Sequence, residues 1–449
     1  MNTPHRFGYG RLLPAFVAVV FTLAMLANPL AVFASGWSQA AVIAASIPTS
    51  APIAFAFNPA GNELWVSASP VTGGAIVQVA QRAAGGAWST ALTIASLHSV
   101  GQVVVQGLSV SLSASNHAVV AWSSGGGVQI VLRALSGVWQ APVSFAPAGG
   151  ASNVLAGLDA QGNGVAAWSR QTATASVVEA VSWSAAGAFG AVTQLSSASQ
   201  GAFLPSLAVN EAGTALVAWQ AAAPLDNSAP YQVETATRPA GGSWSAVSAA
   251  SPVTLQTWSP QVALDGSGGA TVVWEAGTTA NAYHIYAANR PAGGGWGSPT
   301  LLEPGNFYMA GLASVAADAA GNVTAAWVVD DATSGTMFIH SATRPAGGAW
   351  GAASSLGQCM SNGGALCLTP PVAAARDGSI TAVVWSAVAG AGSPNAAVRL
   401  GTGAWAAMVI PGSPKPAFLV VSNNAIASTV WAVPNGVKYH HAWQQSDYR

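Results

Sequence analysis

The chain has 449 residues, of which 51% are apolar and only 6% are charged, with 13 Lys and Arg against 14 Asp and Glu. An ordinary soluble domain has about 25% charged residues, so both signs are scarce here, and the net charge is only −1. This composition argues against nucleic-acid binding, which needs clustered Lys and Arg to neutralise phosphates. The 18 Trp, with abundant Val, Leu and Ala, also argue against a charged disordered chain.

Residues 1–34 have the pattern of a secretory signal peptide. Three basic side chains lie within residues 5–11, and residues 16–27 form an apolar stretch. Pro29 then breaks the helix, and the segment 32–34 supplies small residues at the −3 and −1 positions for cleavage. The sequence therefore predicts an exported protein that is secreted, periplasmic or held at the cell surface.

The segment 12–33 has a second interpretation, an uncleaved membrane anchor, because it is nearly long enough to span a bilayer. Pro14, Asn28 and Pro29 interrupt it and favour cleavage. With the signal peptide removed, we expect no transmembrane span and a single domain over residues 35–449.

A pattern of about 52 residues recurs along this domain. An apolar strand (A) is followed by a Gly-containing turn, a strand ending in Trp (B), a variable loop, a third strand (C), a GG-x-W hairpin and a fourth strand (D) that begins at its Trp. Three clear copies of the first half are PSLAVNEAGTALVAW, PQVALDGSGGATVVW and ASVAADAAGNVTAAW. The strand-B Trp recurs at positions 65, 122, 168, 219, 274, 327, 385 and 431. Such a period fits a four-stranded propeller blade better than a shorter solenoid turn.

The hairpin between strands C and D supplies a second repeated signal. Its clear copies are RPAGGSW, RPAGGGW and RPAGGAW, and weaker copies end at Trp88, Trp139 and Trp405. In one further copy, Trp183 replaces the Arg and Phe189 replaces the Trp. Gly-rich turns between two β-prone segments are typical of β-hairpins.

The two ends of the domain are out of phase with this order. GWSQAAVI, which contains Trp37, reads as a strand D with nothing before it, and NGVKYHHAW, ending at Trp443, reads as a strand C with no strand D after it. We therefore predict an all-β fold, a single β-propeller of four-stranded antiparallel blades. Eight blades are expected, with seven as the alternative, closed when the N-terminal strand joins the last blade. Such closure removes an exposed sheet edge.

Cys359 and Cys367 are the only two cysteines of the chain and lie in one Gly-rich segment. In an oxidising compartment this spacing predicts a disulfide. No His or further Cys lies near them in sequence, so we expect no metal site.

The segment from Thr237 to Trp244 resembles the Asp-box (bacterial neuraminidase) repeat, Ser/Thr-x-Asp-x-Gly-x-x-Trp, which lies between the third and fourth strands of sialidase-like propeller blades. The segments 289–296 and 343–350 resemble it in the same way, although Pro239, Pro291 and Pro345 replace the Asp. The resemblance implies a sialidase-like propeller architecture over the whole mature chain. In that family the box is structural, so it implies no activity by itself.

Hydrolases of this family hold a substrate carboxylate with three arginines. Six arginines of this chain occupy the repeated position before the C–D hairpin, which indicates a structural role such as stacking on a repeat Trp: Arg82, Arg133, Arg238, Arg290, Arg344 and Arg399. Arg170, Arg376 and Arg449 remain, and only Arg170 is expected on a B–C loop. An arginine triad is therefore not available, and sialidase activity is not expected.

The connections of a propeller divide between two rims, here called the turn rim (A–B and C–D) and the loop rim (B–C and D–A). The repeated A–B acids read as turn residues: Asp159, Glu211, Asp265, Asp318 and Asp377. The loop rim carries five other acids, all from the fourth to sixth repeats: Asp226, Glu275, Glu303, Asp330 and Asp331. Trp258, the one Trp without a place in the repeat, is expected in a D–A loop beside them, where it either stacks on a ligand or caps the sheet edge.

This sector of the loop rim is the predicted ligand-binding site, because exposed loops on a rigid scaffold commonly carry function. Its residues are Trp258, Glu275, Tyr283, His284, Phe307, Tyr308, Asp330 and Asp331. We expect a non-enzymatic, monomeric module that binds an extracellular glycan or protein. We expect it to bind no nucleic acid, to need no cofactor and to have no catalytic residue. The alternative is a carbohydrate-active hydrolase, in which Glu275 and Asp330 or Asp331 supply the paired carboxylates of a glycosidase.

Overall fold

The structure is a computed structural model, and it describes residues 41–45, 51–98, 105–125, 127–145, 150–222, 231–253, 256–279, 282–304, 309–331, 336–360, 367, 369–385, 395–410, 418–421, 426–432 and 438–445. The predicted signal peptide lies outside the described residues, as do Asp226, Phe307 and Tyr308.

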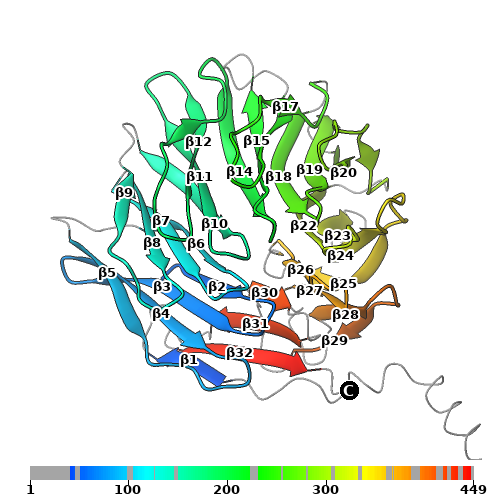
Figure 1. Cartoon of the computed structure of the whole chain (residues 1–449). Coiled ribbons are helices and arrows are strands. Elements are labelled where there is room, and N and C mark those ends of the chain that lie inside the picture. The colour runs from blue at the N-terminus through cyan, green and yellow to red at the C-terminus, as the bar shows by residue number, and fades with distance from the viewer. Residues whose placement is uncertain are drawn as a thin grey trace, which may run out of the picture.

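The described strands follow one another in groups of four, which we number as blades 1 to 8 (Figure 1). Blade 1 comprises β2 (Ile53–Phe57), β3 (Glu63–Val71), β4 (Gly74–Arg82) and β5 (Leu92–His98), and blade 2 comprises β6 (Gln106–Leu112), β7 (Ala118–Ser124), β8 (Gly127–Arg133) and β9 (Val143–Phe145). Blade 3 comprises β10 (Ala151–Leu158), β11 (Gly164–Gln171), β12 (Ser176–Trp183) and β13 (Thr193–Gln194). Blade 4 comprises β14 (Gly201–Val209), β15 (Ala215–Ala222), β16 (Tyr231–Arg238) and β17 (Ser248–Ala249). Blade 5 comprises β18 (Gln256–Leu264), β19 (Ala270–Thr279), β20 (Ala282–Arg290) and β21 (Thr300–Leu301), and blade 6 comprises β22 (Met309–Ala317), β23 (Val323–Asp331), β24 (Thr336–Arg344) and β25 (Ser354–Met360). Blade 7 comprises β26 (Val372–Ala374), β27 (Ile380–Val384), β28 (Ala396–Leu400) and β29 (Ala406–Met408). Blade 8 comprises β30 (Phe418–Val421), β31 (Ile426–Ala432) and β32 (Lys438–Gln445), together with β1 (Ala41–Ala45).

Hydrogen bonds join these strands into seven sheets within the described residues, six with four strands and one with eight. The eight-stranded sheet unites blades 5 and 6 through one parallel pair, Tyr283 with Met309. The all-β propeller prediction is confirmed. Counting sheets gives seven and counting four-stranded units gives eight, because two units share one sheet.

The first strand of the described chain completes the last sheet, as the phase of the repeat predicted. β1 pairs with β32 in antiparallel fashion, with Ala41 opposite His441. The ring is thus closed by segments from the two ends of the domain.

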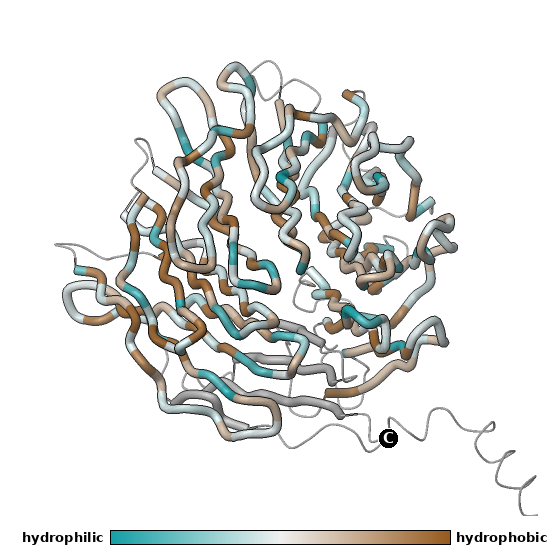
Figure 2. Tube along the Cα trace, in the orientation of Figure 1, coloured by the Kyte–Doolittle hydropathy of each residue, from teal (hydrophilic) through white to brown (hydrophobic). Residues whose placement is uncertain are grey.

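The core lies between neighbouring blades, where strand residues alternate between two buried faces. Figure 2 shows hydrophobic residues along the strands of blades 1 to 7. Seven repeat tryptophans are at most 1% exposed: Trp65, Trp122, Trp168, Trp219, Trp274, Trp327 and Trp385. Burying each large ring contributes several kcal/mol, about 25 cal/mol for every Å² removed from water.

The predicted end of strand B at its Trp is wrong in most blades, although β27 of blade 7 does end beside Trp385. Trp219 lies inside β15, and Trp274 lies inside β19. Since antiparallel pairing to strand C continues past the Trp, the strands extend toward the loop rim. Strand D also begins later than predicted, because β17 starts at Ser248 rather than at Trp244.

The innermost strand of each of blades 2 to 6 contains a β-bulge with a residue at positive φ. These residues are Gly107, Asn153, Leu204, Ser259 and Leu312, with φ between 48° and 59°. Non-glycine residues in this conformation store strain, and bulges redirect the neighbouring side chains. The bulges therefore shape the inner part of the loop rim.

The turn rim is held together by hydrogen bonds from blade to blade. Ala160 N donates to Glu211 O at 3.1 Å, and Gly266 N donates to Ala319 O at 3.1 Å. Arg376 and Glu211 form an ion pair with Nε and Oε1 2.9 Å apart. Their blades, 7 and 4, belong to separate sheets and are not consecutive in the chain, so this pair links two distant parts of the repeat.

Candidate functional site

Three aromatic side chains from two blades form a cluster at the loop rim, which we call the aromatic cluster: Tyr231, Trp258 and Tyr283. The ring centroids of Trp258 and Tyr283 are 5.1 Å apart in an edge-to-face arrangement, and those of Tyr231 and Trp258 are 6.4 Å apart. All three side chains are partly exposed. The cluster thus presents a rigid aromatic surface to solvent.

Trp258 does not lie in a D–A loop, as the sequence predicted, but inside β18, immediately before the bulge at Ser259. Phe203 holds the same position before the bulge of blade 4. Trp258 therefore has a place in the repeat after all, although its neighbours Tyr231 and Tyr283 set its environment.

Glu275 lies in β19 directly opposite Trp258 in the antiparallel register. Its Oε1 accepts a hydrogen bond of 2.6 Å from the backbone N of Leu312, in the bulge of blade 6. Burial raises the pKa of Glu275, and this hydrogen bond opposes the rise. Gly311 permits the approach, because a Cβ there would lie 3.1 Å from Glu275 Oε2.

His284 lies next to Tyr283 in β20, and its Nδ1 is 3.1 Å from the carbonyl oxygen of Glu303. Glu303 itself, expected on the exposed rim, is only 3% exposed. Its Oε2 accepts a hydrogen bond of 3.0 Å from Trp327 Nε1 and lies 2.8 Å from His340 Nδ1. Glu303 is thus a buried acceptor for a core indole.

Asp330 and Asp331 end β23 and are partly exposed. Asp330 is paired with Met309, which in turn is paired with Tyr283, so Asp330 lies in the same sheet two strands from the aromatic cluster. The fold brings Trp258, Glu275 and Tyr283 together directly. Asp331 is the last residue of β23 and pairs with Thr336, the first residue of β24.

Sequence reasoning missed Tyr231, which begins β16 after a loop with little repeat signal. It also missed two acids that serve the core in the same way as Glu303. Trp168 Nε1 donates to Glu179 at 3.0 Å, and Trp219 Nε1 donates to Glu234 at 3.1 Å. The alignment of these acids opposite the repeat Trp was a signal that could have found them.

The repeated arginines stack on the hairpin tryptophans, as predicted. The guanidinium carbon lies 4.9–5.6 Å from the ring centroid in four blades: Arg82 on Trp88, Arg133 on Trp139, Arg290 on Trp296 and Arg399 on Trp405. Arg170 lies in β11 rather than in a loop. Its Nε is 2.7 Å from Glu179.

The turn acids also act locally. Asp159 Oδ1 accepts hydrogen bonds from the backbone N of Gln161 and Asn163 at 2.9 and 2.8 Å. Asp265 does the same for Ser267 and Gly269. These carboxylates stabilise the A–B turns.

The predicted disulfide is present, with the Cα atoms of Cys359 and Cys367 5.8 Å apart. Among the described residues, no group of three or more His, Cys, Asp or Glu side chains could hold a metal ion. Nor does any helix in this part of the chain have the length and apolar character needed to span a membrane.

No protein-family model and no curated protein sequence matches this chain. Among solved structures, the BP39L lectin from Burkholderia pseudomallei is similar over 82% of this chain and 100% of that chain, with a TM-score of 0.50 and 16% identity. An α-L-arabinanase of Penicillium chrysogenum is similar over 91% and 98%, with a TM-score of 0.39 and 11% identity. The α-L-arabinofuranosidase Arb93A of Fusarium graminearum is similar over 80% and 97%, with a TM-score of 0.38 and 12% identity. At these identities the similarity concerns the propeller fold alone.

Proposed function

We propose that the protein is an exported, non-enzymatic β-propeller that binds an extracellular glycan at the aromatic cluster. One observation carries this proposal: Trp258 is held between Tyr231 and Tyr283 while keeping part of its surface in solvent. Aromatic faces pack on the apolar faces of sugar rings, and the ring edges keep a polar surrounding. The fold similarity to a lectin supports the same class of ligand.

Glu275 supplies the polar part of this site. Its Oε1 is fixed by the backbone of Leu312, so the other carboxylate oxygen is left to accept hydroxyl hydrogen bonds. Hydrogen bonds to an ionised acceptor are stronger than neutral ones. Glu275 and Trp258, opposite one another in register, would grip the polar and the apolar side of one sugar unit.

A glycan array on the purified protein tests the proposal, followed by titration of the retained glycan. Trp258→Ala should weaken binding at least tenfold, and Trp244→Ala is the matched control, because Trp244 is a partly exposed tryptophan of the C–D hairpin. Equal binding by the wild type and Trp258→Ala would reject the site. A blank array with capture of a defined extracellular protein would favour the protein-ligand alternative.

A carbohydrate-active hydrolase is the second candidate, and one observation favours it. Burial raises the pKa of Glu275, as a general acid requires. Asp330 is the nearest candidate for the second carboxylate along the sheet. Turnover of a bound glycan that is lost in Glu275→Gln would replace the binding proposal with this one.

The resemblance of the C–D hairpins to the Asp-box is also part of the proposal. Gly242 N donates to Pro239 O at 3.0 Å, so the hairpin makes a tight turn without the Asp side chain. We infer a degenerate Asp-box in which Pro replaces the Asp.

A further inference from the structure

A pocket of about 280 Å³ lies on the turn rim between blades 1 and 2, far along the ring from the aromatic cluster. Blade 1 contributes Gln81, Arg82 and Trp88 to its walls, and blade 2 contributes Asn116 and Arg133. A pocket of this size accommodates a ligand smaller than the usual drug-sized molecule.

Arg133 is the unusual residue of this pocket, because it is a cation only 4% exposed. Its guanidinium donates to Gln81 Oε1 and, at 2.8 Å, to the carbonyl oxygen of Asn116. Its Nε has no hydrogen-bond partner among the described residues. All the acceptors of this buried charge in the described part of the chain are neutral, which is costly unless an anion completes the site.

Other repeat arginines are compensated by a carboxylate. Arg82 Nη2 lies 2.6 Å from Glu63 Oε1. Burial lowers the pKa of Arg344 and Arg399, while Asp265 and Asp318 respectively raise it, so each cation is stabilised by an acid.

Asp265 and Asp318 come from the A–B turn of the blade before their arginine, whereas Glu63 lies in the same blade as Arg82. Asp265 and Asp318 begin turns closed by the same backbone hydrogen bond that Asn58 makes to Asn62 in blade 1. Asn58 therefore stands where the acid would face Arg133, and it carries no charge. Arg290 also has a neutral acceptor, Thr237, but its partial exposure leaves it to solvent counter-ions.

We propose that the pocket between blades 1 and 2 binds a small hydroxylated monocarboxylate, such as a sugar acid, whose carboxylate pairs with Arg133. A planar guanidinium binds carboxylate through two parallel hydrogen bonds. This site is independent of the glycan site at the aromatic cluster.

The remaining walls define the rest of the ligand. The ring of Trp88, whose centroid lies 5.6 Å from the guanidinium carbon of Arg82, gives an apolar face for a sugar ring. Glu63 also lines the pocket, paired with Arg82, so a second negative group on the ligand would be repelled. The polar side chains of Asn62, Gln81 and Ser89 line the pocket as well and suit hydroxyl groups. One charge and several hydroxyls fit this combination.

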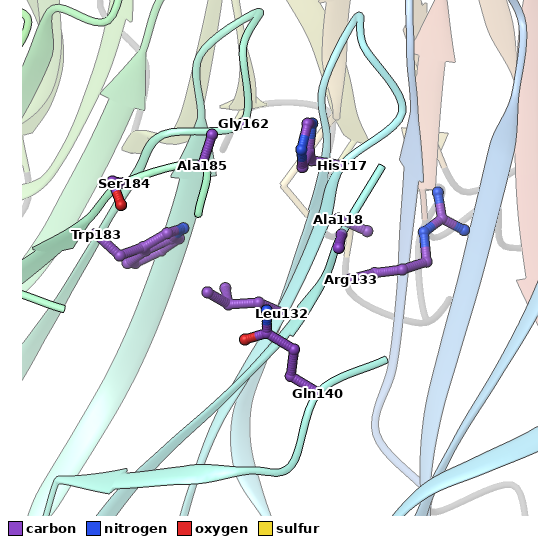
Figure 3. A pocket seen from close by; sticks show the side chains of 10 residues that line it. His117, Ala118, Leu132, Arg133, Gln140, Gly162, Trp183, Ser184 and Ala185 are labelled. Atoms are coloured by element: carbon purple, nitrogen blue, oxygen red, sulfur yellow. The ribbon is translucent and has the colours of Figure 1, made fainter. Parts of the chain in front are cut away.

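The next boundary has no arginine at the equivalent repeat position, although Arg133 also lines its pocket from the side of blade 2. There Trp183 occupies the repeat position of Arg133, and the remaining space is about 10 Å³ (Figure 3). In the same view Arg133 points away from Trp183 toward the strands of blade 1. The guanidinium is thus directed into the larger pocket.

Isothermal titration of the full-length protein with D-glucuronate, D-glucose and sodium sulfate tests this site. We expect binding of glucuronate, and at least tenfold weaker binding of glucose and of sulfate. Arg133→Gln should weaken glucuronate binding at least tenfold, as the loss of a charge-assisted pair implies. Arg399→Gln is the matched control, because Asp318 already compensates that arginine.

Asn58→Asp is the second variant, since it supplies the acid found in other blades while keeping Arg133. It should also weaken glucuronate binding at least tenfold, and Trp258→Ala should leave it unchanged. Equal affinity for glucuronate and glucose, sulfate binding as tight as glucuronate, or unchanged binding in Asn58→Asp would each overturn the proposal. If Trp258→Ala retains glycans on an array as well as the wild type does, this result would contradict the glycan site at the aromatic cluster and leave the Arg133 site unaffected.

Discussion

Two neighbouring blade boundaries on the turn rim follow the same repeat but are lined by different side chains, as three equivalent positions show. At the boundary of blades 1 and 2 the positions hold Gln81, Asn116 and Arg133; at the boundary of blades 2 and 3 they hold Leu132, Gly162 and Trp183. The first pocket has a volume of about 280 Å³ and the second about 10 Å³. Figure 3 shows the residues that line the second.

The difference shows how a repeat can keep its backbone and change its surface. Trp183 is 4% exposed and packs with Trp168 in the core between blades 2 and 3. Its ring lies so close to Gly164 that a Cβ there would be 2.2 Å from it. An aromatic ring thus fills the gap that the charged residue leaves open.

The largest expected effect is that of Trp183→Ala, which should open the closed boundary. Removing a buried aromatic side chain should lower the free energy of unfolding by about 3–5 kcal/mol, measured by denaturant unfolding. Trp139→Ala, at a partly exposed hairpin position, is the control and should cost less. Equal losses would mean that Trp183 does not fill the boundary.

A slightly smaller effect is expected for Glu63→Gln at the open boundary. It leaves Arg82, whose side chain is 11% exposed, without its anion, so unfolding free energy should fall by about 3 kcal/mol. The loss should vanish when Arg82→Gln is introduced as well. A loss that persists in the double variant would show that Glu63 acts through other contacts.

Exchanging the turn residue of the two boundaries should have an intermediate effect. Asn116 and Gly162 both have positive φ, but a Cβ at Gly162 would lie 2.4 Å from His117 Cγ. Gly162→Asn should therefore cost about 1–3 kcal/mol, whereas Asn116→Gly should cost less. Similar melting temperatures for Gly162→Asn and the wild type would contradict the crowding.

The smallest effect concerns Glu275, which crosses the boundary of blades 5 and 6 on the loop rim. Because burial raises its folded-state pKa, its contribution to stability is fully present below the unfolded value of about 4.3 and is lost as the pH rises through the folded pKa. Glu275→Gln keeps an acceptor for Leu312, so the stability of the wild type relative to this variant should fall as the pH rises from about 4 to 7. A flat difference in thermal unfolding across this range would contradict it.

The sequence predicted the repeat, the closure of the ring and the disulfide because each leaves a local signal. Trp at regular intervals marks the core, the phase of the first and last strands marks the closure, and an isolated Cys pair marks the bridge. The arginine stacking also followed from the spacing of Arg and Trp in one hairpin.

The site could be predicted only in part, because its geometry depends on contacts between blades. Glu275 is fixed by Leu312 of the next blade, and the burial of Glu303 depends on Trp327 and His340. A residue's place in the repeat does not reveal these partners. The pairing of Trp258 with Tyr231 likewise joins two blades across a poorly repeated loop.

The pairing of β1 with β32 has a consequence for the time course of folding. These strands come from opposite ends of the domain, so the last blade cannot form until its final strand has emerged. During synthesis, earlier blades can assemble on their own hairpins while β1 remains unpaired. An exposed strand edge invites pairing with other chains, so a factor that shields β1 during this interval would raise the yield of the closed ring.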